Sequence, residues 1–246
     1  MYRILFIVFF FLFSFCDAST IDPNKKDSEY IKFGNKHNFV VSIEGKIEDG
    51  KFFFGSGTLL NKKWILTAAH VVNNAKSAYV KFEGKNYTVE RIIIHKSFKE
   101  ENVGIYDIAL CKITEDINIS YYPELYTDKN ENGKICSIAG FGMTGTLESG
   151  VVKFDKQKRG GLNKITGLYK HLLICKADLP EESTELEQLI ASGDSGGGLF
   201  IDNKIAGVNS IVMASDEEAN SDYGDESGHT RVSLFVDWIQ EVIKIY

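Results

Sequence analysis

The sequence predicts an all-β fold, arranged as a barrel or a sandwich. From Phe39 onward, short runs rich in β-branched and aromatic residues alternate with turn residues at close spacing. A second series of such runs begins at Ile135. The stretch 123–133 between the two series is polar and rich in turn residues, so we expect it to be a connector.

A single helix is expected at the C-terminal end. Apolar residues recur there with helical spacing: Phe235, Trp238, Ile239, Val242, Ile243 and Tyr246. Ser233 stands where it can cap the first turn. We therefore predict an amphipathic helix over 233–246.

Composition places the chain among folded globular proteins. Of its 246 residues, 43% are hydrophobic and 25% are charged. The formal net charge of -6 argues against nucleic acid as the main partner. The acidic segment 215–226 is expected to be a solvated loop, or else a surface that attracts basic substrate side chains.

The first residues predict a cleaved secretory signal over 1–18. Arg3 precedes the unbroken apolar run Ile4 to Phe13, and Cys16-Asp17-Ala18 places small residues before the expected cut. The run is too short to favour a membrane-spanning helix. We therefore expect a secreted, extracellular protein with no membrane attachment after cleavage. The polar residues 19–30 that follow are expected to form a flexible leader or a propeptide.

Cysteine usage is sparse for an oxidising compartment. Cleavage of the signal removes Cys16 and leaves Cys111, Cys136 and Cys175. An odd number of thiols permits at most one bridge within the chain. Two sequons, which begin at Asn86 and Asn118, predict glycosylation on exposed loops.

The segment 191–198 (Ala-Ser-Gly-Asp-Ser-Gly-Gly-Gly) predicts a tight loop that exposes a serine. A serine hydroxyl needs a neighbouring base to act as a nucleophile, and donors for the oxyanion that it creates. The main-chain N–H groups of Gly193 and Ser195 can converge on such an oxyanion. The alternative is a glycine-rich hairpin with a solvated serine.

A histidine and an acid elsewhere in the chain decide between these interpretations. His70 follows the apolar run Trp64–Thr67, and Asp107 begins another apolar run. A carboxylate buried there needs hydrogen bonds, and an imidazole N–H supplies one while fixing the histidine tautomer. Taken singly, His70 is better explained as a core histidine and Asp107 as a helix or turn cap. Together with Ser195 they favour catalysis.

These segments resemble the three signatures of the chymotrypsin-like (trypsin-like, S1) serine proteases. The matching stretches are Thr67-Ala68-Ala69-His70, Asp107-Ile108-Ala109-Leu110 and Gly193-Asp194-Ser195-Gly196-Gly197. The resemblance implies a peptidase domain over 31–246 built from two six-stranded antiparallel β-barrels. The first barrel would span about 31–122 and the second about 134–232, with the active site in the cleft between them.

The resemblance also implies the roles of the site residues, which follow the known triad of that family. His70 takes the proton of Ser195 and returns it to the leaving amine, while Asp107 orients the imidazole. The N–H groups of Gly193 and Ser195 form the oxyanion hole. No metal or organic cofactor is implied, and the partners are protein or peptide substrates and protein protease inhibitors.

Several of the family's disulfides are missing from this chain. Gly55 and Val71 stand where the family bridges the loop of the catalytic histidine, and Ala191 and Ile201 replace two further cysteines. Cys136 matches a family cysteine whose usual partner position is now Ile201. A bridge from Cys136 to Cys175 is therefore a hypothesis, because the strand of Cys175 can lie beside that of Cys136.

The activation end of the chain also departs from the family pattern. Family zymogens are cut before Ile-Val-Gly-Gly, and the new amine pairs with the aspartate that precedes the nucleophile, here Asp194. No such motif is present in this chain. Either Ile31 begins a shortened version of that terminus, or Asp194 is held in another way.

The expected specificity pocket is apolar. The resemblance places Leu189 at its base, and Ser210, Ile211 and Val212 along the strand beside the substrate. A charged P1 side chain, the residue before the cut, would lie there without a partner. Val212 in place of the family's glycine would narrow the entrance. We therefore expect small to medium apolar P1 residues.

The sequence thus predicts a secreted serine endopeptidase that acts through an acyl-enzyme on Ser195. The alternative is a binding protein on the same fold that cannot assemble its oxyanion hole. An esterase with a Gly-x-Ser-x-Gly elbow fits less well, because its histidine would follow the serine, whereas His70 precedes Ser195.

Overall fold

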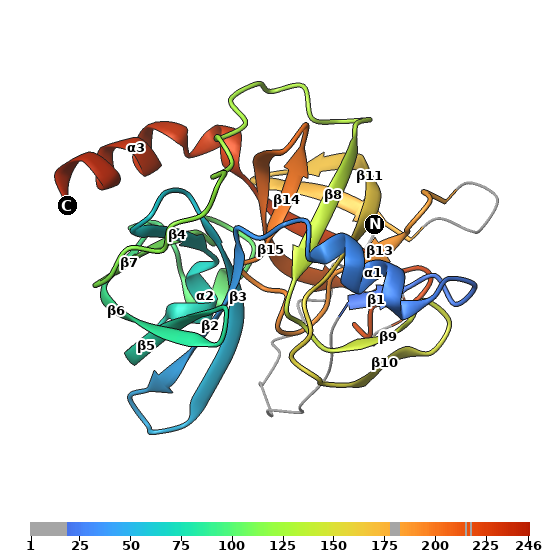
Figure 1. Cartoon of the computed structure of the whole chain (residues 1–246). Helices are drawn as coiled ribbons and strands as arrows, with labels where there is room; N and C mark the ends of the chain where they lie inside the picture. Colours follow the sequence, from blue (N-terminus) through green and yellow to red (C-terminus); the bar gives the residue numbers. More distant parts are fainter. Residues whose placement is uncertain (1–18, 178–182, 215, 217) are drawn as a thin grey trace.

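The computed structural model describes residues 19–177, 183–214, 216 and 218–246. The signal peptide predicted over 1–18 lies outside these residues, as do Ser215 and Glu217 of the acidic segment. The described chain is built mostly of strands, in two closed antiparallel barrels and a separate four-stranded sheet (Figure 1). This confirms the two six-stranded barrels expected from the sequence.

Barrel 1 comes from the first half of the chain and lies on the left in Figure 1. Its closed order is β2-β3-β4-β7-β6-β5. The strands are β2 (Val40–Ile47), β3 (Phe52–Leu59), β4 (Trp64–Thr67), β5 (Ala75–Phe82), β6 (Lys85–Ile94) and β7 (Ala109–Ile113). Alternate side chains point into the barrel, and Ile43, Leu59, Ile65 and Leu110 are fully buried there.

Barrel 2 comes from the second half and closes in the order β11-β12-β16-β15-β14-β8. The strands are β8 (Ile135–Gly140), β11 (Arg159–Tyr169), β12 (Leu172–Lys176), β14 (Gly198–Ile201), β15 (Lys204–Met213) and β16 (Glu226–Arg231). The sequence did not predict β11, because its glycines and lysines dilute the strand pattern. It nevertheless pairs with both β8 and β12.

Cys136 and Cys175 lie in the core of barrel 2. Cys136 on β8 and Cys175 on β12 flank β11, which pairs with both strands. Both side chains are buried, and their Sγ atoms lie 3.9 Å apart, in contact but not covalently bonded. Cys111 is buried separately in the core of barrel 1.

The four-stranded sheet contains the start of the described chain, where the structure differs from the expected flexible leader. Strand β1 (Ser19–Ile21) runs between β9 (Thr144–Thr146) and β13 (Gln188–Leu189), and β10 (Gly150–Lys153) completes the sheet. Thr20 pairs with Leu189 on one side and with Gly145 on the other. All of β1 is buried.

A helix after β1 fastens this segment to barrel 2. Helix α1 (Asp27–Gly34) begins with Asp27, whose carboxylate receives Arg159 from β11 at 2.6 and 2.9 Å. The Arg159 side chain is 1% exposed and also binds Asp155 at 2.9 and 2.8 Å. These charge-assisted bonds lower the pKa of Asp155 to about 2. Residues 19–34 are therefore part of the folded domain.

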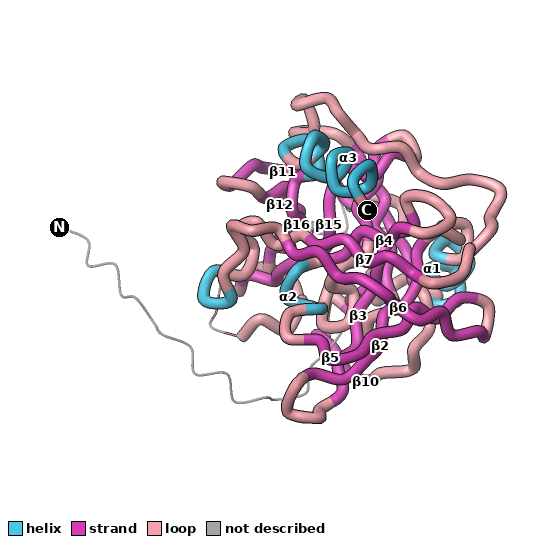
Figure 2. Tube along the Cα trace, turned by 90° about the vertical axis from the view of Figure 1, so that its left-hand side faces the viewer, coloured by secondary structure: helices cyan, strands magenta, loops and turns pink. Residues whose placement is uncertain are grey.

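The expected C-terminal helix is present as α3 (Val236–Ile245), after a short 3-10 turn η2 (Val232–Leu234). Its residues Ile239 and Val242 are buried, each burial contributing roughly 1.5–3 kcal/mol. Figure 2 shows α3 above β4 and β7 of barrel 1. The predicted Ser233 cap is wrong: its Oγ donates to the buried Glu131 at 2.6 Å instead.

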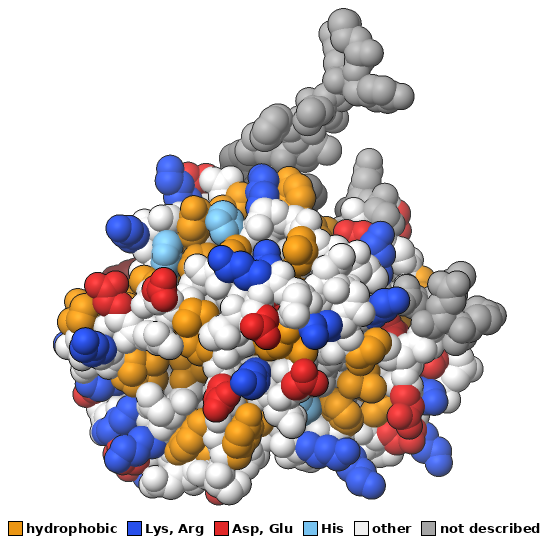
Figure 3. Space-filling view, turned by 90° about the horizontal axis from the view of Figure 1, so that it is seen from above, with side chains coloured by type: hydrophobic (Ala, Val, Ile, Leu, Met, Phe, Trp, Pro, Cys, Tyr) orange, Lys and Arg blue, Asp and Glu red, His pale blue; other side chains and the backbone are white. Residues whose placement is uncertain are grey.

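The surface seen from above carries mixed charge. In Figure 3, basic and acidic side chains are interspersed, and apolar side chains form small groups between them. Asn86 and Asn118 of the two sequons are exposed, but only Asn118 lies on a loop as expected, because Asn86 is part of β6. In the part of the chain that the structure describes, no helix has the length and apolar character to cross a membrane.

Candidate active site

His70 lies where a buried strand ends. All of β4 is buried, and the short helix α2 (Ala69–Val72) begins two residues after it. Ala69, Val71 and Val72 are buried around the histidine, which leaves the imidazole as the partly exposed side chain, at 25%. The strand thus presents His70 from a rigid support, as the sequence predicted.

Asp107 lies two residues before β7 and is fully buried, and its carboxylate accepts three hydrogen bonds. The main-chain N–H of His70 donates to Oδ1 at 2.9 Å, and the imidazole Nδ1 lies 2.7 Å from Oδ2. The third donor is Ser210 Oγ on β15, 2.6 Å from Oδ2. Barrel 1 and barrel 2 therefore both contribute donors to one carboxylate.

The pKa values of this pair follow from burial and mutual charge. Burial lowers the pKa of His70, but the charge of Asp107 and its hydrogen bond raise it more, so the pKa lies above its ordinary value. Burial raises the pKa of Asp107, and the contacts with His70 and Ser210 lower it more. The carboxylate is thus ionised at neutral pH. In a neutral imidazole, this acceptor favours the tautomer that carries the proton on Nδ1, which leaves the lone pair on Nε2.

Tyr106 holds the backbone that presents Asp107. Its φ of 55° is unusual for a bulky residue, which indicates that its surroundings impose this conformation. The ring stacks on His95 with centroids 5.1 Å apart and packs against His171 at 4.3 Å. The sequence analysis missed this positioning residue, because nothing in the local pattern distinguishes Tyr106 from an ordinary loop tyrosine.

The loop of Ser195 adopts the tight conformation predicted from its glycines. Gly193 and Gly196 have φ of 91° and 85°, in the region that favours glycine. A Cβ on Gly196 would lie 2.1 Å from Thr67 Oγ1, so the loop packs directly on the end of β4, the strand before His70. Ser56 on β3 adds two bonds of 2.8 Å, from its N–H to the Ser195 carbonyl and from its hydroxyl to the Gly193 carbonyl.

The N–H groups of Gly193 and Ser195 are available to an oxyanion. Neither donates a hydrogen bond to any other group among the described residues. Ser195 is half-buried. Among the described residues, its hydroxyl forms no hydrogen bond with His70. Such bonds are often long in unliganded enzymes and tighten on substrate binding.

Asp194 lies beneath this loop, fully buried. Its carboxylate accepts the N–H of Gly142 at 2.9 Å, the N–H of Ala191 at 3.2 Å and the hydroxyl of Ser19. Ile31 lies within α1 instead of reaching this carboxylate. The sequence analysis left two alternatives for Asp194, a shortened terminus at Ile31 or another partner. The structure has the second, because Gly142, Ala191 and Ser19 hold the carboxylate.

The residues expected to line the specificity pocket divide into three groups. Leu189 is fully buried in β13, beside Thr20 of β1. Ile211 and Val212 are partly buried at the exposed end of β15. Ser210 lies on the same strand, and its hydroxyl donates to Asp107, a contact that the sequence did not predict.

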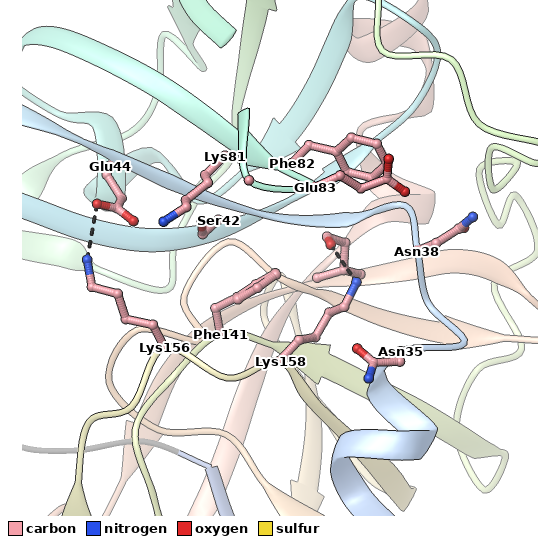
Figure 4. Close-up of a pocket in the computed structure, with 12 residues that line it drawn as sticks. Asn35, Asn38, Ser42, Glu44, Lys81, Phe82, Glu83, Phe141, Lys156 and Lys158 are labelled. Carbon is pink, nitrogen blue, oxygen red and sulfur yellow. Dashed lines mark hydrogen bonds and ion pairs between the residues drawn. The ribbon is translucent and has the colours of Figure 1, made fainter. Parts of the chain in front are cut away.

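A separate cleft of about 430 Å³ lies between the barrels, lined by none of the three candidate catalytic residues. Lys81 enters it from barrel 1, Phe141 enters directly after β8, and Lys156 and Lys158 enter just before β11 (Figure 4). Lys156 pairs with Glu44 at 3.2 Å and covers the ring of Phe54, which adjoins Gly193. Lys156 is therefore the residue through which the lining of the cleft approaches the loop of Gly193, by way of Phe54. The described residues hold no cluster of three His, Cys, Asp or Glu side chains suited to a metal ion.

Comparison with known proteins agrees with this geometry. The family model described as Trypsin matches residues 32–239, which is most of the chain. The chain belongs to the trypsin family. Within this family, "Trypsin" of Simulium vittatum is 27% identical over 192 residues, which cover 69% of this chain and 75% of the relative.

Two further comparisons extend over more of the chain. "Collagenase" of Hypoderma lineatum is 28% identical and covers 82% of this chain and 81% of the relative. "Chymotrypsin-like elastase family member 1" of Homo sapiens is 24% identical over 82% and 86% of the two chains. A solved HL collagenase structure superposes with a TM-score of 0.66 at 22% identity, covering 85% of this chain and 95% of that one. This superposition shows that the solved structure shares the fold described above.

The histidine–aspartate pair predicts a reversal in the titration of His70. In Asp107→Asn the imidazole loses its anionic partner while burial remains, so we expect the pKa of His70 to fall from above its ordinary value to below it. An NMR titration of the imidazole C–H signals measures this. His37, whose pKa burial lowers to about 4, lies on another element and should not move. An unchanged pKa of His70 in Asp107→Asn would contradict the prediction.

Proposed function

We propose that this member of the trypsin family is a secreted serine endopeptidase with His70, Asp107 and Ser195 as its catalytic triad. The observation that carries the proposal is the fully buried Asp107 carboxylate bound to His70 Nδ1 at 2.7 Å, with the Ser195 loop packed on the strand before that histidine. In the proposed triad, Nδ1 of His70 binds Asp107 and the opposite ring nitrogen, Nε2, is the base for Ser195.

The proposed reaction begins with attack of Ser195 Oγ on the carbonyl carbon of a peptide bond. His70 Nε2 takes the hydroxyl proton as the new C–O bond forms, and the carbonyl oxygen becomes an oxyanion held by the N–H groups of Gly193 and Ser195. His70 then gives the proton to the leaving amine as the C–N bond breaks. Water, activated by the same imidazole, hydrolyses the acyl-enzyme.

The pH dependence of this reaction follows from the raised pKa of His70. The imidazole acts as a base only when neutral, so kcat/KM should be low in acid and rise as the pH passes that pKa. Asp107 keeps its charge throughout this range, because its own pKa lies below its ordinary value.

Labelling with a fluorophosphonate probe tests the triad. We expect the wild type to be labelled and Ser195→Ala to be inert. His70→Ala should react slower by about 10⁴-fold or more, because the hydroxyl loses its base. Ser192→Ala changes an exposed neighbouring serine and serves as the matched control, which should label normally.

Two results would oppose the proposal. Equal labelling of Ser195→Ala and the wild type would show that another group reacts. No labelling of a folded wild type with an authentic N-terminus would favour the alternative, a binding protein on the same fold. The available N–H groups of Gly193 and Ser195 speak against that alternative.

We further propose a preference for small to medium apolar P1 residues. Leu189 offers no charge at the expected base of the pocket, and Val212 narrows its entrance. A peptide library should therefore give the highest kcat/KM with Ala or Val at P1. Val212→Gly should shift the preference toward larger side chains. A library optimum at Lys or Arg would contradict this pocket and point to the acidic segment 215–226.

Secretion, glycosylation and one disulfide complete the proposal. The signal would direct the chain into the secretory pathway, where Asn86 and Asn118 can be glycosylated because their side chains are exposed. Protein protease inhibitors are expected partners of such a site, with no role for nucleic acid or for a membrane after cleavage.

We propose that Cys136 and Cys175 form a disulfide in the secreted protein, since their Sγ atoms already touch at 3.9 Å. Closing this loop should add about 4 kcal/mol to the free energy of unfolding in the chain-entropy treatment. Peptide mapping without reduction should find the linked pair, and reduction should lower the urea midpoint. Both cysteines alkylated as thiols in the native secreted protein would contradict the bridge.

A further inference from the structure

The carboxylate of Asp194 is buried without a positive charge beside it. Its hydrogen-bond donors are the Gly142 and Ala191 N–H groups and the Ser19 hydroxyl, all of them neutral. Among the described residues no lysine, arginine or histidine forms an ion pair with it. Burial raises the pKa of Asp194 to about 6, against the effect of these hydrogen bonds and of the charge of Arg159, which forms no ion pair with it. An ionised carboxylate in this place calls for a cation.

The side chain that reaches this carboxylate belongs to Ser19, at the start of β1. Ser19 is 1% exposed, and its Oγ contacts both Asp194 and Gln188 Nε2, the latter at 2.9 Å. The main-chain nitrogen of Ser19 is attached to the carbon next to the one that carries Oγ. That nitrogen therefore lies in the immediate neighbourhood of the Asp194 carboxylate.

The sequence independently predicts a cut at this residue. The apolar run Ile4 to Phe13 and the small residues around Ala18 indicate signal cleavage between Ala18 and Ser19. Hydrolysis of that bond adds water, leaves a carboxylate on Ala18 and gives Ser19 a free α-amine. At neutral pH this amine is largely protonated.

We propose that signal cleavage is itself the activating cut. The α-ammonium of Ser19 pairs with Asp194, supplies the missing cation and orders the oxyanion loop, so the protease needs no separate propeptide. This inference rests on the function proposed above and adds its regulation. It replaces the leader expected over 19–30 by a mature N-terminus at Ser19.

The contacts of β1 explain how the pairing would act on the active site. Asp194 stands between Gly193 and Ser195, whose N–H groups form the proposed oxyanion hole. On the other side, Thr20 pairs with Leu189 and donates from its hydroxyl to the Ser221 carbonyl. The inserted N-terminus thus contacts the oxyanion loop, β13 and the segment around Ser221 at the same time, so it stabilises their positions together.

The residues after β1 keep the terminus in place. Tyr30 is fully buried in α1, and its hydroxyl donates to the Glu187 carbonyl at 3.0 Å, just before β13. Arg159 holds the start of the same helix through Asp27. A cut before Ile31 would remove β1 and most of these anchors. The ordered segment 19–34 therefore favours Ser19 over any later start.

The test uses one polypeptide with two N-termini. The chain 19–246 is produced with a short extension whose last residue forms a specific cleavage site directly before Ser19. Half of the purified sample is then trimmed to a free Ser19 amine. Both halves share every side chain of the domain. Fluorophosphonate labelling rate and kcat/KM on a P1 Ala or Val peptide are measured for each, with Ser195→Ala as the blank.

We expect trimming to raise both values by about 10²-fold or more, comparable to restoring one oxyanion donor. Equal activity before and after trimming would overturn the inference while leaving the proposed function intact. A trimmed chain with a native circular dichroism spectrum and no reaction would count against the proposed function itself, and with it this inference. Terminal sequencing of the protein secreted from cells expressing residues 1–246 should begin at Ser19, and a start at Ile31 or later would also overturn it.

Discussion

The buried charge of Asp107 fixes how the two barrels of this protein meet. Its carboxylate receives His70 from barrel 1 and Ser210 from barrel 2, and its main-chain carbonyl accepts Thr230 Oγ1 at 2.9 Å. A buried carboxylate is tolerated only while its lone pairs are filled. A relative shift of the barrels would expose this carboxylate to solvent or remove its hydrogen-bond donors. The contacts that stabilise the charge therefore also set the orientation of the imidazole.

The residues of the candidate site were largely predictable, because their local sequence limits the possible conformations. Gly193 and Gly196 allow only a tight loop around Ser195, and the apolar run before His70 ends where a strand must end. The role of Ser210 was not predictable in the same way, since a strand pattern does not tell which neighbour a given hydroxyl finds. The role of Tyr106 was not predictable for a similar reason. Its positive φ is accompanied by packing against the ring of His171, which is far away in sequence.

The two barrels followed from the pattern of short apolar runs and from the family resemblance, whereas β1 and β11 did not. β1 is short and polar, and its hydroxyls are satisfied by Asp194 and by the Ser221 carbonyl, which are far away in sequence. Such a segment looks like a flexible leader until its partners are known. β11 is hidden by Gly160, Gly161 and Gly167, which carry no side chain to reveal the alternation.

The loop that carries His70 is held by packing where many relatives use a disulfide. A Cβ on Gly55 would lie 2.6 Å from Val71 Cγ1, so the valine fills the space that a second side chain would otherwise need. Val71 itself is 6% exposed. Unlike a disulfide, dispersion contacts and burial do not require an oxidant and are not broken by thiols. The geometry around the imidazole is therefore set equally in reducing and in oxidising surroundings, which widens the range of environments where this protein keeps its shape.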